Sequence, residues 1–190
     1  RSRAADLGSA PTGSGTAAAL TFLAACVAAR SVVEIGTGTG ISGLHLLAGM
    51  APDGILTTIE VEAEYQRAAK KSFTEAGVAP TRTRLINGRA LDVLPRLTDG
   101  AYDLVFVDPP YDLSEAALAD VLTALGAPGR LTDRALVVVE RSSRSPEPSW
   151  PPDWTWSSTL RAATAAVVGS PRSVSSKQGN RRGWFASSPF

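Results

Sequence analysis

Short apolar runs alternate with longer amphipathic segments along the first 140 residues of the chain. Five of the runs have the length and β-branched content of buried strands, and strands are predicted over 31–35, 55–59, 84–87, 103–107 and 135–139. The segments before and between them favour helices over 16–30, 41–50, 62–76, 91–97 and 115–125. Ser114 can cap the last of these helices, and Gly126 closes it.

This order of elements predicts an α/β fold. Strands that are separated by helices of this length imply right-handed crossovers, and so a doubly wound, mostly parallel, Rossmann-like sheet with helices on both faces. The alternation fails beyond residue 141, where prolines interrupt a Trp-rich stretch, and Ser, Arg and Gly dominate from Gly169 onward. We expect one domain over 1–168 and a poorly ordered tail over 169–190, which supplies no clear sixth or seventh strand.

The composition and the lengths of the apolar runs predict the number of domains and the cellular location. A chain of 190 residues with 44% hydrophobic content suits one compact domain. Since no run of about 18 uncharged apolar residues occurs, neither a membrane helix nor a signal peptide is expected, and a cytoplasmic location is predicted. Cys26 is the single cysteine, which excludes an internal disulfide and a cysteine-rich metal site.

The charge is unevenly distributed, although the formal net charge is only +1. Residues 1–140 hold 12 basic and 16 acidic side chains, whereas residues 141–190 hold seven basic and two acidic ones. A basic end is typical of nucleic-acid contact and equally of a solvated tail, so both interpretations stay open.

A glycine-rich turn follows the first predicted strand. Closely spaced glycines at Gly36, Gly38 and Gly40 let a ligand approach the backbone and meet the free N–H groups of the next helix. The spacing G-x-G-x-G differs from the G-x-G-x-x-G of dinucleotide sites. Together with Glu34 it resembles motif I of class I S-adenosylmethionine methyltransferases, which implies that the turn, including Thr37, wraps the amino-acid part of that cofactor.

Two further segments extend the predicted cofactor site. Glu60 ends the second strand, where a carboxylate can accept hydrogen bonds from both hydroxyls of a ribose. The same resemblance implies that Gly88, Arg89 and Ala90, after the third strand, lie along the adenine ring. S-adenosyl-L-methionine is therefore the expected cofactor, and Asp108 completes its binding residues; the alternative is a purely structural turn.

The fourth predicted strand ends in Asp108, Pro109, Pro110 and Tyr111. The two prolines hold their carbonyls in a stiff turn at the strand ends, where open α/β sheets bind ligands. The carboxylate of Asp108 and the carbonyl of Pro109 can hold the hydrogens of an exocyclic amine while Tyr111 stacks on the base. These four residues are the predicted catalytic residues, and a structural Pro-Pro turn is the alternative.

Two resemblances divide the chain near Asp108. Residues from about 4 to 108 resemble actinobacterial members of the catechol-type O-methyltransferase family, most clearly in 33–40 and 102–108. The Asp-Pro-Pro-Tyr sequence resembles the Asn/Asp-Pro-Pro-Tyr/Phe motif of amino methyltransferases that act on adenine, cytosine or guanine. From Asp108 to about Trp156 the chain resembles the bacterial 16S rRNA guanine-N2 methyltransferase family.

Both resemblances imply S-adenosylmethionine, and they differ in the acceptor. The catechol-type family holds a divalent metal with an Asp after the fourth strand and an Asp-Asn pair after the fifth. In this chain Glu140 and Arg141 follow the fifth strand, and because an arginine is a poor neighbour for a hard cation, no metal site is predicted.

The leading hypothesis is therefore an enzyme that methylates the exocyclic amine of a nucleobase, guanine N2 in 16S rRNA. Its expected partner is ribosomal RNA or the assembling small subunit, and no membrane. The first alternative is a small-molecule, catechol-type O-methyltransferase, which the larger share of the chain favours. The second is a catalytically silent module that binds nucleoside or RNA.

Overall fold

The computed structural model describes residues 12–97, 101–110, 113–142, 144–152, 154–161 and 164–171. Its helices are α2 Ser14–Cys26, α3 Ile41–Gly49, α4 Ala63–Glu75, α5 Ala90–Val93 and α6 Glu115–Leu125, with 3-10 turns η1 Pro80–Arg82 and η2 Leu94–Arg96. Its strands are β1 Ser31–Ile35, β2 Ile55–Glu60, β3 Thr83–Asn87, β4 Tyr102–Val107, β5 Leu131–Ser142, β6 Trp154–Arg161 and β7 Thr164–Pro171.

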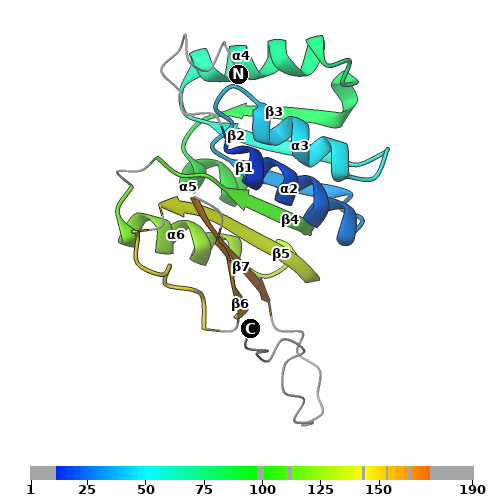
Figure 1. Cartoon of the computed structure of the whole chain (residues 1–190). Helices are drawn as coiled ribbons and strands as arrows, with labels where there is room; N and C mark the ends of the chain where they lie inside the picture. The colour runs from blue at the N-terminus through cyan, green and yellow to red at the C-terminus, as the bar shows by residue number, and fades with distance from the viewer. Residues whose placement is uncertain are drawn as a thin grey trace.

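The strands of the described residues form one seven-stranded sheet in the order β3-β2-β1-β4-β5-β7-β6 (Figure 1). The five strands from β3 to β5 are parallel, and β7 is antiparallel to both of its neighbours. The predicted doubly wound, mostly parallel fold is thereby confirmed. Because the chain runs outward in one direction from β1 and in the other from β4, the carboxyl ends of these two strands mark the switch point at which such sheets bind ligands.

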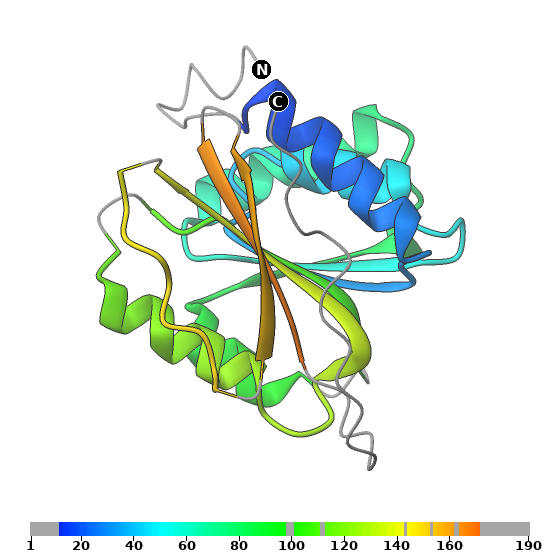
Figure 2. The same ribbon diagram turned by 60° about the horizontal axis from the view of Figure 1, so that its bottom comes forward.

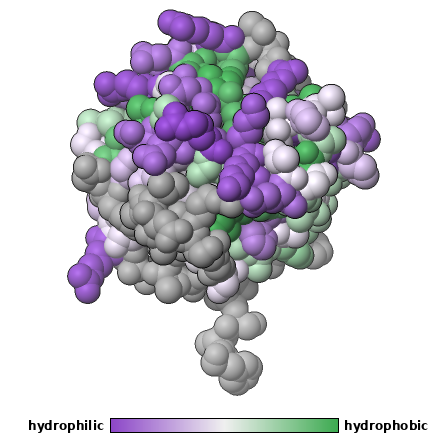
Figure 3. All heavy atoms as spheres, turned by 90° about the horizontal axis from the view of Figure 1, so that it is seen from above, coloured by the Kyte–Doolittle hydropathy of each residue, from purple (hydrophilic) through white to green (hydrophobic). Residues whose placement is uncertain are grey.

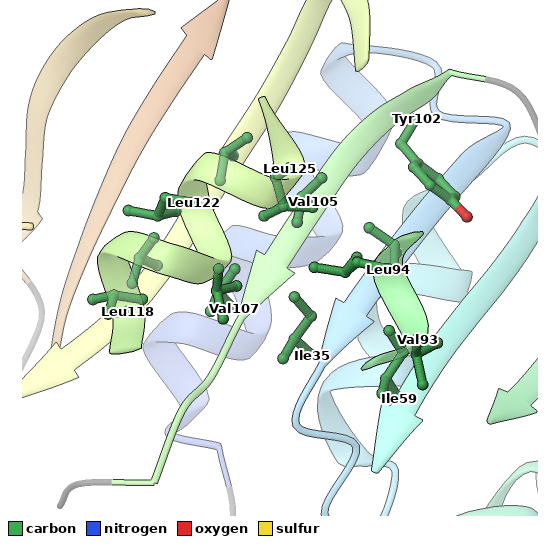
Figure 4. Close-up of a cluster of buried hydrophobic side chains, with 14 of the residues drawn as sticks. Ile35, Ile59, Val93, Leu94, Tyr102, Val105, Val107, Leu118, Leu122 and Leu125 are labelled. Atoms are coloured by element: carbon green, nitrogen blue, oxygen red, sulfur yellow. The ribbon is translucent and has the colours of Figure 1, made fainter. Parts of the chain in front are cut away.

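Helices cover both faces of the sheet, and alternating side chains of each strand feed two apolar clusters. Val33 and Ile35 of β1 pack with Val105 and Val107 of β4 toward α6, as Figure 4 shows for the labelled side chains. Val32, the residue before Val33, belongs to the other cluster, which packs under α2, α3 and α4. A central strand that is buried on both faces is what its uninterrupted apolar run predicts.

The outer surface of α4 is polar. Ala68, Ala69 and Phe73 are buried against the sheet, and the remaining face carries charged residues that include Arg67 and Lys70. Figure 3, which views the molecule from above, shows hydrophilic side chains over much of this face. In the described part of the chain, no helix has the length and apolarity needed to cross a membrane. The cytoplasmic location stays a prediction.

The region after residue 141 departs from the sequence-based expectation. The alternating pattern predicts no strand after residue 141 and little regular structure after about residue 169, yet β6 and β7 form an antiparallel pair on the β5 edge, and Figure 2 shows them side by side. The segment 144–152, which contains prolines at 146, 148, 151 and 152, is not part of the sheet. The segments of β6 and β7 that follow contain Thr, Val and Trp, residues that favour strands. β7 also crosses the predicted domain end at residue 168, and residues 172–190 of the predicted tail lie outside the described chain.

Candidate active site

The turn between β1 and α3 requires glycine for two different reasons. Gly36, Gly38 and Gly40 have φ values of +93°, +49° and +86°, a region that side chains with a Cβ rarely adopt. At Gly36 a Cβ would in addition lie 2.2 Å from the backbone oxygen of Asp108. The Asp108 N–H in turn donates to the Ile35 carbonyl at 2.9 Å. The glycine turn and the end of β4 are thus in direct backbone contact.

Glu60 is fixed to this turn by two backbone hydrogen bonds. One carboxylate oxygen accepts from the Gly38 N–H at 2.8 Å, and the other accepts from the Glu62 N–H at 2.9 Å. Its side chain is 7% exposed. Each carboxylate oxygen has a second acceptor direction, so a ribose hydroxyl that reaches the carboxylate meets an acceptor whose orientation is already set. The predicted position of Glu60 beside the glycine turn agrees with this geometry.

Glu34 lies beneath the turn and is completely buried. Its carboxyl oxygens accept hydrogen bonds from the Ser42 hydroxyl at 2.5 Å and the Thr58 hydroxyl at 2.6 Å. Thr37, which we predicted to contact the cofactor, joins the same network through the Thr58 hydroxyl. Burial raises the pKa of Glu34 to about 7, although the two hydroxyl donors lower it. The contacts of the Glu34 carboxyl with the Ser42 and Thr58 hydroxyls support the turn from beneath, and its predicted contact with the cofactor stays a prediction.

The loop after β3 is held at the same end of the sheet. The Gly88 N–H donates to the Glu60 carbonyl at 2.9 Å, and the Asn87 side-chain amide donates to the carbonyls of Glu60 and Val61 at 2.9 and 3.1 Å. Arg89 is exposed and precedes α5, which begins at Ala90. The sequence-predicted cofactor residues on three loops are therefore brought to one edge, with Arg89 the most peripheral.

Asp108 stands one residue beyond β4, at the switch point. Burial raises the pKa of its carboxyl to about 7, and the negative charges of Glu140, Glu34 and Glu60 raise it further, in that order. Pro109 is half-buried and Pro110 is exposed. Tyr111, the fourth predicted catalytic residue, lies outside the described residues.

Glu140 is a site residue that the sequence-based prediction did not include. It lies one residue beyond the last β4–β5 pair, Val107 with Val139, and therefore level with Asp108. Its side chain is 7% exposed, and one oxygen accepts from the Thr16 hydroxyl at 3.3 Å. The available signal is its place at the end of a predicted strand, but a pairing with Arg134, Arg141 or Arg144 explains the residue equally well at the level of the sequence. In the structure Arg141 pairs instead with Glu115.

The described residues do not bring together a full set of ligands for a divalent metal. Among the described residues, no group of three or more His, Cys, Asp or Glu side chains is placed to hold a metal ion. Asp108 and Glu140 supply two carboxylates, and the guanidinium of Arg141 is turned away from them to Glu115. What the arrangement offers is a cluster of acidic groups, which favours a cationic ligand and can take a proton from one that is bound beside it.

The fold and this site define a class I methyltransferase architecture. A model of the O-methyltransferase family matches residues 6–114, more than half of the chain. The chain belongs to this family of S-adenosylmethionine-dependent methyltransferases, so the predicted class and its cofactor are confirmed at the level of the family.

Relatives and solved structures are consistent with the family. A protein of Mycobacterium sp. strain KMS, provisionally named an O-methyltransferase, is 58% identical over 108 residues, which are 57% of this chain and 49% of that protein. The chain spans about half the length of the curated relatives it matches. The O-methyltransferase TomG from Streptomyces achromogenes, solved in complex with S-adenosylmethionine, is 26% identical with a TM-score of 0.71 over 90% of this chain and 86% of that chain. A Corynebacterium glutamicum protein has a TM-score of 0.75 at 25% identity over 93% and 89% of the two chains.

These findings correct the predicted acceptor. The expectation of guanine-N2 methylation in 16S rRNA is wrong, because the family model, the curated relatives and TomG all indicate O-methyltransferases. The reason for expecting a ribosomal partner falls with it. In physical terms, the carboxylate of Asp108 and the proline carbonyl hold any hydrogen-bond donor, a hydroxyl as well as an amine, so these residues do not determine the acceptor.

Proposed function

We propose that this protein transfers a methyl group from S-adenosylmethionine to a hydroxyl group of a small molecule. The observation that carries the proposal is the half-buried carboxyl of Asp108, whose pKa is raised to about 7, in backbone contact with the glycine turn. This acceptor class was the first alternative at the level of the sequence, and the family membership favours it.

The residues of the turn fit the cofactor. Two backbone N–H groups hold the Glu60 carboxylate, which would accept hydrogen bonds from the ribose hydroxyls. The left-handed glycines keep the turn free of side chains, so that the amino-acid part lies against the backbone. The surrounding carboxylates favour the positive charge of the cofactor. When it is bound, S-adenosylmethionine supplies an electrophilic methyl group on a cationic sulfur.

Asp108 then acts as the general base. A hydroxyl is a weak nucleophile until its proton is removed, and a base whose pKa lies near the working pH is suited to this task. The Asp108 carboxylate would take the hydroxyl proton, and S-adenosylmethionine, when bound, would supply the methyl carbon to the acceptor oxygen and keep the electron pair of the broken carbon–sulfur bond on its sulfur. Below pH 7 the carboxyl is increasingly protonated, so its capacity to take the proton falls.

A labelled-methyl assay tests this function. The protein is incubated with S-adenosylmethionine carrying a labelled methyl group and with a panel of phenols, and in parallel with undermethylated small-subunit RNA. We expect label in at least one phenol, recovered as its methyl ether, and none in RNA. Label in RNA alone would overturn the proposal. Binding of S-adenosylhomocysteine without transfer to any phenol would instead support the silent binding module.

A further inference from the structure

Thr16 connects two parts of the chain that lie 124 positions apart in the sequence. It is the third residue of α2 and is only 3% exposed, and its hydroxyl donates to Oε1 of Glu140 at 3.3 Å. The side chain of Glu140 is buried as well, and its Oε2 has no partner among the described residues. Within the described part of the chain, the Thr16 hydroxyl is therefore the hydrogen-bond donor that this carboxylate has.

A buried carboxylate depends on such a donor, because its charge is otherwise removed from water without compensation. Glu140 contacts the first turn of α2, where unpaired N–H groups and the helix dipole favour an anion. The helix has no charged side chain, and its N-cap residue Gly13 supplies no side-chain hydrogen bond. The guanidinium of Arg141 pairs with Glu115 instead. Thr16 is therefore the polar side chain through which α2 acts on Glu140.

Glu140 lies beside the proposed base. It stands level with Asp108 at the carboxyl ends of β5 and β4, neighbouring parallel strands of the kind that lie about 4.8 Å apart. Burial raises the pKa of Asp108 to about 7, and the charges of Glu140, Glu34 and Glu60 raise it further, in that order. The position of the Glu140 carboxylate thus affects the proton affinity of Asp108 more than that of any other charged group named here.

We propose that Thr16 is a positioning residue, whose hydroxyl holds the Glu140 carboxylate beside Asp108. Through this contact α2 fixes the place of the negative charge next to the base, and with it the pH range in which Asp108 takes up a proton. The inference rests on the proposed function, because that function makes Asp108 the general base. A packing role of Thr16 would depend on the shape of its side chain, whereas the positioning role depends on its hydroxyl.

The test measures the titration of Asp108 itself, in the full chain without ligand. The side-chain carboxyl carbons of the aspartates are labelled with carbon-13, and the NMR signal of Asp108 is identified by its absence from Asp108→Asn. In Thr16→Val the Glu140 carboxylate loses its donor and either turns to solvent or loses its charge, so that less negative charge acts on Asp108. We expect the midpoint of the Asp108 titration to fall by about 0.5 pH unit or more, a roughly threefold lower proton affinity.

Three further variants separate the hydroxyl from the packing of α2. Thr16→Ser keeps the hydroxyl and should keep the wild-type midpoint. Thr16→Ala lacks the hydroxyl and has a high helix propensity, so it should repeat the fall and covers the case in which the valine variant does not fold. Thr21→Val is the matched control on the same helix. The Thr21 hydroxyl donates to the carbonyls of Ala17 and His45 and not to a carboxylate, so its loss should leave the midpoint unchanged.

The outcomes separate this inference from the function on which it rests. An unchanged or higher midpoint in the variants that lack the Thr16 hydroxyl, or an equal fall in Thr21→Val, would overturn the role of Thr16. Methyl ethers in the labelled-methyl assay would leave the proposed function standing in that case. Conversely, a lower midpoint in Thr16→Val without transfer to any phenol would support the positioning of Glu140 by Thr16 and count against the function.

Discussion

Glu60 and Glu140 lie near the carboxyl ends of β2 and β5, and each is 7% exposed, yet their carboxylates are held differently. Both oxygens of Glu60 accept from backbone N–H groups. Glu140 has one side-chain donor, and its second oxygen has no partner in the part of the chain that the structure describes. The backbone therefore supplies hydrogen-bond donors to both oxygens of Glu60, whereas one oxygen of Glu140 remains available to a donor on a ligand.

The difference coincides with the extent of the family match. Residues 6–114 match the family and include the glycine turn, Glu60 and Asp108, whereas Glu140 lies beyond the match. Backbone donors depend on the path of the chain, so a whole family with one fold can keep them. Side-chain partners change with single substitutions. The family match thus covers the cofactor side and Asp108, and it leaves Glu140 of the acceptor side outside.

The largest predicted effect concerns the cofactor side. Gly36→Ala should lower the free energy of unfolding by about 3–5 kcal/mol and abolish binding of S-adenosylhomocysteine. The added Cβ would lie 2.2 Å from the Asp108 backbone oxygen, and the positive φ adds strain of its own. Urea unfolding and calorimetry measure the two effects.

Gly77 provides the matched control. It also has a positive φ, +72°, but nothing lies within 4 Å of the position that its Cβ would take. Gly77→Ala should therefore cost only the backbone strain, about 1–2 kcal/mol, and leave cofactor binding intact. Equal losses in the two variants would show that strain alone, and not the contact between the turn and β4, makes Gly36 necessary.

The next effect separates binding from chemistry at the acceptor side. Asp108→Asn should lower kcat by roughly 10²–10⁴-fold, the usual contribution of a general base, and change the affinity for S-adenosylhomocysteine by no more than a few fold. For the wild-type protein, kcat/KM should rise with pH through about 7, because the base is active only when it is deprotonated. The asparagine variant should lose this rise.

A companion variant checks the cause of the pKa. Glu140→Gln removes the charge that raises the pKa of Asp108 most among its neighbours, so the midpoint of the pH profile should move to lower pH. An unchanged midpoint, or an equal loss of cofactor affinity in Asp108→Asn and Gly36→Ala, would contradict the division between the two sides of the site.

Sequence reasoning was most successful where local pattern and tertiary packing favour the same structure. It gave β1 as 31–35 and α6 as 115–125, the bounds found in the structure, because a fully buried strand and a capped amphipathic helix are both visible in a short window. It missed β6 and β7, whose pairing with β5 depends on residues far apart in the chain.

The same limit applies to the site. The glycine turn, Glu60 and Asp108 follow recognisable spacings, so the sequence could place them together at one edge of the sheet. The orientation of a carboxylate depends on its hydrogen-bond donors. For Glu34 these are the hydroxyls of Ser42 and Thr58, eight and 24 positions away in the sequence, so a short window does not show them. Likewise, the pairing of Arg141 with Glu115 spans 26 positions, and only the fold shows that Glu140 is left without it.

The last prediction concerns the packing beneath the cofactor side and uses the pH dependence of stability. The pKa of Glu34 rises from 4.5 to about 7 on folding, so the folded state binds its proton more tightly than the unfolded state does. This part of the stability is fully present below pH 4.5 and is lost as the pH rises to about 7, a change on the order of 3 kcal/mol. Glu34→Gln keeps an acceptor and a donor for the Ser42 and Thr58 hydroxyls and removes the titration. Urea unfolding between pH 4.5 and 8 should therefore show that the free energy of unfolding depends less on pH in this variant than in the wild type or in the exposed control Glu64→Gln. An equal pH dependence in all three proteins would contradict the prediction, because it would mean that burial does not raise the pKa of Glu34.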